Sequence, residues 1–234
     1  MLDRQALREE ALRIHGRYVR EVVEALSLCP WAEGAREQGR VRTEVVFGSE
    51  GDDAMLTRVA ELITTLEGDA SVEIGLLVMP ELGLGRIALQ HFAARVRERY
   101  RPETSQRAFA IADFHPDAAP QLDSPEQLVA FIRSSPDPSL QLVRRSAIEA
   151  VRLGGEPGTR FVDAATLAQG GLAALAASAP SLSERVARAN LRTVQELGVE
   201  RVQALLADIA ADRDRSYARF GLAAPAWRRH GEVR

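Results

Sequence analysis

The sequence predicts an α/β fold: a small parallel or mixed β-sheet of about three to four strands, covered by helices, with a helical C-terminal region. Two observations predict it. Apolar or β-rich runs at residues 42–47, 72–79 and 108–114 have the length of buried strands, and segments with helical spacing separate them. After residue 120, only helical patterns are expected to follow.

The elements of the first half are predicted from the spacing of apolar residues. Residues 4–28 repeat apolar side chains every three or four positions, so they are expected to form a long amphipathic helix that ends before Pro30. Two further helices are expected, at about 53–67 and around 89–100. They would connect the three strands and cover the sheet.

The second half is predicted to contain four helices. Ser124 followed by Pro125 is a typical helix start, and the rigid connector Ser135-Pro136-Asp137-Pro138 is expected to lead into another helix that Ser139 caps. Helices at about 181–197 and 199–214 follow. The predicted organisation is an α/β core over residues 1–152, a helical extension packed on it over 153–214, and a polar tail over 215–234.

Composition narrows the classes of function. A net charge of −3 does not suggest a nucleic-acid or membrane partner. The polar N-terminus, and the lack of any apolar run of about 18 residues, lead us to expect a cytoplasmic protein. Every basic residue other than histidine is arginine, which excludes a Schiff-base lysine and a P-loop lysine.

The single cysteine, Cys29, is the first candidate site residue, and it excludes an intramolecular disulfide. Its thiol could be a nucleophile or a soft metal ligand. Because Cys29 would lie at the C-terminal end of a helix, the helix dipole is expected to raise its pKa. The alternative is a small buried apolar residue beside Trp31.

Asp113 and His115 form the second candidate site. Two positions apart at the end of a strand, their side chains project to the same side, so they could be a base and its orienting group, or two metal ligands. The alternative is structural: Asp113 caps a turn and His115 bonds a backbone carbonyl. Arg144 could bind an anion beside them, or pair with a surface acid such as Glu149.

Several of these segments resemble a family of bacterial and plastid proteins known as domain of unknown function 1415. Residues 27–32 (SLCPWA) look like its LCPFA segment, and 39–42 like its G-x-I-R. Residues 114–117 (FHPD) match its SFHPD, and 135–144 resemble its SPYPMLHLLR. Arg188-x-Asn190-x-x-Thr193 fits a later segment. The resemblance implies a fold and a site, but no reaction.

This chain departs from the family pattern at three places. Met79 replaces a histidine before proline, Gln141 replaces a histidine between two leucines, and Arg133-Ser134 replaces Asn-Arg. With His115 the one family histidine that is kept, the resemblance does not imply a metal site. Residues 153–182 resemble an insertion.

The leading prediction is a small-molecule enzyme of unassigned reaction. Cys29 and His115 would be the reactive pair, for acyl, amide or thiol chemistry. The imidazole would be oriented by Asp113 or Asp117, and an anionic substrate would be bound near Ser135 by Arg133 or Arg144. The alternatives are a non-catalytic binding or partner protein that keeps the fold, and a metal-binding protein using Cys29 and His115. The sequence does not identify a cofactor or an oligomeric state.

Overall fold

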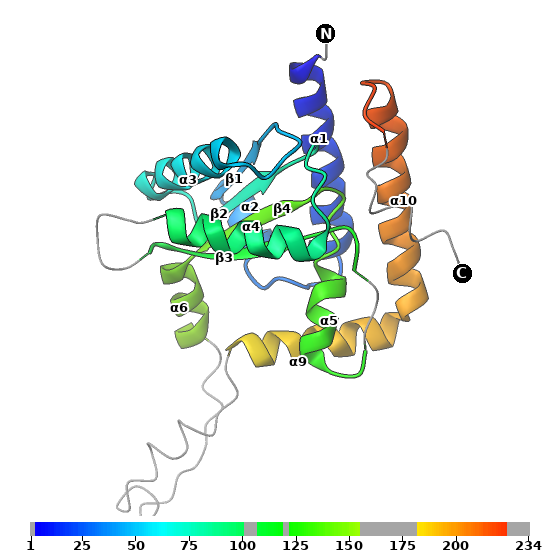
Figure 1. Cartoon of the computed structure of the whole chain (residues 1–234). Coiled ribbons are helices and arrows are strands. Elements are labelled where there is room, and N and C mark those ends of the chain that lie inside the picture. Colours follow the sequence, from blue (N-terminus) through cyan, green and yellow to red (C-terminus); the bar gives the residue numbers. More distant parts are fainter. Residues whose placement is uncertain (1–2, 101–106, 119–121, 155–181, 224–234) are drawn as a thin grey trace, which may run out of the picture.

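The computed structural model describes residues 3–100, 107–118, 122–154 and 182–223 (Figure 1). The order of its elements is α1 (Arg4–Tyr18), the π-helical segment η1 (Val19–Glu24), α2 (Ala32–Glu37), β1 (Val41–Val45), α3 (Asp53–Gly68), β2 (Ile74–Val78), α4 (Arg86–Arg99), β3 (Phe109–Phe114), α5 (Pro125–Ile132), β4 (Ser139–Arg144), α6 (Arg145–Gly154), α9 (Leu182–Leu197) and α10 (Val199–Ala218). In the part of the chain it describes, no helix has the length and apolar character needed to cross a membrane.

The sheet is mixed and has four strands in the order β1-β2-β4-β3. β1 and β2 are parallel, whereas β4 runs antiparallel to both of its neighbours. The predicted α/β class, with a small mixed sheet and a helical C-terminal region, is confirmed.

The prediction of a helix from residue 139 onward is wrong for residues 139–144, which form the strand β4, whereas residues 145–154 do form the helix α6. In β4, Leu140 and Leu142 belong to the core beneath α3 and α4, whereas Ser139 and Gln141 line a cavity. This alternation has the period of two that a strand requires. The sheet supplies partners for β4 on both edges, so its backbone hydrogen bonds are satisfied without a helix.

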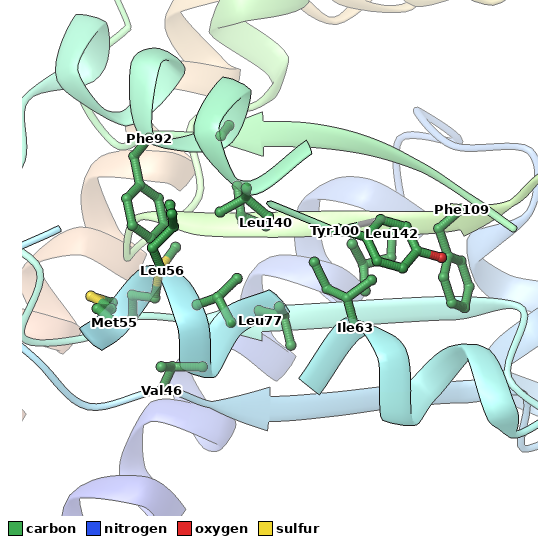
Figure 2. Packing of buried hydrophobic residues seen from close by; sticks show 14 of the residues in the cluster. Val46, Met55, Leu56, Ile63, Leu77, Phe92, Tyr100, Phe109, Leu140 and Leu142 are labelled. Atoms are coloured by element: carbon green, nitrogen blue, oxygen red, sulfur yellow. The ribbon is translucent and has the colours of Figure 1, made fainter. Parts of the chain in front are cut away.

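Helices cover both faces of the sheet. Side chains of α3 and α4, such as Leu56 and Phe92, pack on Leu77, Leu140 and Leu142 on one face (Figure 2). On the other face, Val78 packs with residues of α1, and Ile74 and Leu76 pack with Ala35 of α2.

The first helical segment is not one continuous α-helix. Asp3 caps α1, which ends at Tyr18 and continues as the π-helical η1. The chain then reverses at Ser27, a non-glycine residue with a φ of 50°. This reversal brings Cys29 back beside η1 instead of leaving it at the tip of a long helix.

The C-terminal helix α10 runs alongside α1 (Figure 1). On the surface, Arg13 and Arg17 of α1 bond the carboxylate of Asp212 at 2.7–3.0 Å. Because α10 extends to Ala218, the predicted boundary after residue 214 falls inside this helix. The prediction for 215–234 otherwise lies largely outside the described residues.

A buried polar cluster anchors α10 to the sheet. The Arg213 Nε donates to Asp137 Oδ1 at 2.7 Å, and the Tyr217 hydroxyl donates to Asp137 Oδ2 at 2.7 Å. Arg213 also donates to the carbonyl of Pro80 at 3.1 Å. We call Asp137, Arg213 and Tyr217 the α10 anchor; each is at most 1% exposed.

Candidate functional site

A cavity of about 470 Å³ lies on the sheet face opposite α3 and α4. Its floor is formed by strands β1, β2 and β4, and its walls by α1, η1, α2, α5 and α9. Most of its lining is aliphatic, including Val19, Val23, Ile74, Leu76, Val129 and Ile132. Because side chains alternate between the two faces of a strand, every second residue reaches the cavity. Ser139 and Gln141 of β4 and Phe114 of β3 line it. Leu140 and Leu142, the neighbours in β4, face α3 and α4.

The charged groups in this cavity are all of one sign. Arg20, Arg36 and Arg133 line it, and its described lining contains no aspartate or glutamate. Arg36 already pairs with Glu24 at 2.7 Å, and Arg20 is exposed. The cavity is therefore electropositive in a protein whose net charge is −3.

Arg133 is held at the end of α5, where it is the C-cap residue. Its guanidinium lies over the ring of Phe114, 5.4 Å from the ring centroid. Among the described residues it makes no side-chain hydrogen bond and no ion pair. Burial lowers its pKa, although the charge of Asp113 opposes that shift. Arg133 is half-buried, and its cation has no carboxylate partner among the described residues.

Cys29 lines the same cavity and is half-buried. Burial raises the pKa of its thiol, while the backbone amides of Trp31 and Ala32 and the charge of Arg133 act in the opposite direction. The raised pKa agrees with the prediction, but the predicted cause is wrong. The sulfur faces amide groups at the start of α2, not the carbonyl end of a helix, so burial is what favours the protonated thiol.

Asn190, on α9, is a polar residue of the cavity that the predictions missed. It is 3% exposed, and its Nδ2 donates to the carbonyl of Leu28 at 3.1 Å. Its Oδ1 accepts no hydrogen bond from a described residue. Asn190, Cys29 and Arg133 are polar residues of the cavity lining.

His115 does not join Cys29 in the cavity. Its Nδ1 accepts from the backbone amide of Asp117 at 3.0 Å, so Nε2 carries the proton and donates to the carbonyl of Leu84 at 2.9 Å. Burial lowers its pKa. Asp113 lies on the same side of the sheet and pairs with Arg97 of α4 at 3.6 Å. The contacts of His115 correspond to its structural alternative, a bond to a backbone carbonyl. Asp113 pairs with Arg97 instead of capping a turn, and Asp117 is exposed.

The predictions for Arg144 and Ser135 need correction. As an even-numbered residue of β4, Arg144 faces α3, where it donates to the carbonyls of Val72, Leu66, Glu67 and Asp69 and stacks on Phe109. It thus satisfies carbonyls at the C-terminal end of α3, instead of turning toward His115 or pairing with Glu149. The Ser135 hydroxyl donates to the carbonyl of Asp137 at 2.5 Å and stabilises the turn before β4.

Replacing Arg144 with leucine should lower the free energy of unfolding by about 1–2 kcal/mol, because the carbonyls at the end of α3 lose their charged donor. Chemical denaturation would measure this loss in the free energy of unfolding. The matched control is Arg145→Leu, which removes an exposed arginine one position further on. Equal stabilities of the two variants would contradict this role for Arg144.

His15 is a second buried polar residue that the predictions missed. It lies on the buried stripe of α1 and contributes to the cavity wall, and neither ring nitrogen has a hydrogen-bond partner among the described residues. Burial lowers its pKa to about 4, although Asp137 opposes the shift. A histidine on the apolar stripe of a helix was the sequence signal that could have identified it.

Comparisons with known proteins give one match. The family model described as protein of unknown function (DUF1415) matches residues 11–154. No curated protein and no solved structure matches the chain significantly. Among the described residues, no group of three or more histidine, cysteine, aspartate or glutamate side chains is arranged to hold a metal ion.

Proposed function

The chain belongs to the DUF1415 family of proteins of unknown function, and we propose that this member binds a small organic anion in the cavity beneath α9. The observation that carries the proposal is Arg133. Its guanidinium has no carboxylate partner among the described residues, and it lines a mostly aliphatic cavity. A carboxylate on a ligand would supply the missing charge and accept two parallel hydrogen bonds.

The rest of the cavity favours a ligand with an apolar body. Its volume of about 470 Å³ lies within the range of small-molecule sites, and the aliphatic lining would desolvate an alkyl group. Phe114 fixes the guanidinium from one side, which reduces the entropy lost when an anion binds. These features support an amphipathic carboxylate over a strongly hydrated inorganic ion.

Binding is better supported than catalysis by a Cys29–His115 pair. Burial keeps the Cys29 thiol in its protonated form, and a base would be needed to activate it. Both nitrogens of His115 are engaged by backbone groups, and those of His15 are enclosed. The geometry therefore favours the second of the functions predicted from sequence, a binding protein that keeps the fold.

Titration calorimetry with a branched carboxylate, 4-methylpentanoate, tests the proposal. Arg133→Gln should weaken binding about 10–100-fold, the loss of one charge-assisted contact of about 1.5–3 kcal/mol. The neutral amide of the same acid should bind as weakly to the wild type as the acid binds to the variant. The matched control is Arg192→Gln, which removes an exposed arginine of α9. Equal affinity of Arg133→Gln and wild type would refute the proposal.

A further inference from the structure

Resting on this proposed function, we infer that the ligand is a linear carboxylic acid of at least about ten carbons. Its carboxylate binds Arg133, and its chain crosses the sheet from β3 to β1. The inference starts from the strand register of the residues in the cavity floor. Phe114 of β3 is paired with Ser139, and Val41 of β1 is paired with Ile74. These residues all line the cavity, and β3 and β1 are the two edge strands. The floor therefore extends across the whole width of the sheet.

The dimensions of the floor set a lower limit on the length of the chain. In the strand order β1-β2-β4-β3, the edge strands are three spacings of about 4.8 Å apart, so the floor is about 14 Å wide. The two ends of the floor are also displaced along β4. Phe114 pairs with the first residue of β4, Ser139. Ile74 pairs with Val143, four positions later. An extended chain advances about 1.2 Å per bond, so about ten carbons are needed to approach the far corner.

The polarity of the lining changes along the same diagonal. The guanidinium of Arg133 lies over Phe114, and the floor residues of β4 beside it are Ser139 and Gln141. At the opposite corner, apolar residues of the lining pack together: Val19, Trp31, Val41, Ile74 and Leu76. A carboxylate at the first corner and an alkyl chain that ends at the second match this change in polarity.

Calorimetry with linear acids tests the length of the ligand. Decanoate should bind roughly 100-fold more tightly than hexanoate, the linear isomer of 4-methylpentanoate, because each added methylene buried in the lining contributes about three- to fourfold. In Val41→Asn, which places an amide at the far corner, this ratio should fall about tenfold, and hexanoate should keep its relative affinity. The matched control is Arg42→Asn, which introduces the same side chain at the next, exposed position of β1 and should keep the wild-type ratio.

The fluorescence of Trp31 tests where the chain ends. The Trp31 Nε1 donates to the carbonyl of Ala147 at 3.3 Å, and Ala147 follows the end of β4 that lies away from Phe114. A bromine atom quenches indole fluorescence when the two are in contact. At saturation, 10-bromodecanoate should quench strongly, whereas 6-bromohexanoate, whose bromine stays near Arg133, should quench weakly. Trp31→Phe measures the contribution of Trp227, the other tryptophan of the chain.

The outcomes separate this inference from the proposed function. Equal affinities of decanoate and hexanoate, or equal quenching by the two brominated acids, would overturn the inference. Binding of short acids that is weakened by Arg133→Gln would then leave the proposed function standing. If decanoate binds Arg133→Gln as tightly as it binds the wild type, or if no carboxylate binds at all, both are overturned.

Discussion

Arg213→Met is expected to lower the free energy of unfolding by about 3–5 kcal/mol, the cost of leaving one partner of a buried ion pair uncompensated. Asp137, at 0% exposure, would lose the 2.7 Å bond from Arg213 Nε, while the carbonyl of Pro80 would lose its donor. Burial opposes the charged form of Arg213, yet the charge of Asp137 and the hydrogen bonds to Asp137 and Asp214 together outweigh it and raise the pKa of Arg213.

Chemical denaturation at neutral pH measures this effect, and two further variants make it specific. Arg215→Met removes an exposed arginine of the same helix, so its stability should stay within about 0.5 kcal/mol of wild type. The double variant Arg213→Met/Asp137→Asn should recover part of the loss, because the orphaned charge is gone while the Tyr217 hydroxyl keeps an acceptor. A loss below about 1 kcal/mol for Arg213→Met would show that the anchor contributes little.

The sequence could predict the elements of the fold whose signals are local. The spacing of apolar residues and the Ser124 cap identified α3, α4 and α5, because capping and amphipathic packing depend on neighbours within about one turn. β4 was mistaken for a helix because Leu140 and Val143 also fit helical spacing. Only its hydrogen bonds to β2 and β3, which are distant in sequence, decide between the two.

Prediction of the site depended on which face of the sheet each side chain occupies. Cys29 and Arg133 were predicted and do line one cavity, whereas Asp113 and Arg144 lie on the other face. A shift of one position in a strand exchanges the faces, and the register of a mixed sheet cannot be read from one sequence. Asn190 was missed because its contact with Leu28 spans 162 positions of the chain.

A histidine whose folded pKa is depressed makes stability fall as the pH is lowered, and His15 should show this strongly. Burial lowers its pKa from 6.5 to about 4. The contribution of neutral His15 to the free energy of unfolding is therefore complete above about pH 6.5 and is lost progressively between pH 6.5 and pH 4. In that interval the unfolded chain binds a proton that the folded protein excludes. The expected loss from this residue between pH 7 and pH 5 is about 2 kcal/mol.

Unfolding free energies of the wild type and His15→Leu, measured at several pH values from 7 to 5, isolate the effect. Leucine fills a similar volume and removes two enclosed nitrogens without partners, so the variant should be at least as stable as wild type at pH 7. The difference in unfolding free energy between the variant and the wild type should then grow by about 2 kcal/mol on going to pH 5.

His115, whose pKa is also lowered by burial, contributes equally to both curves and cancels in the difference. His91→Gln, at an exposed position, is the matched control for removal of an imidazole. Parallel curves for wild type and His15→Leu would mean that His15 is protonated inside the folded protein, with Asp137, the nearby acid that acts on it, compensating the charge.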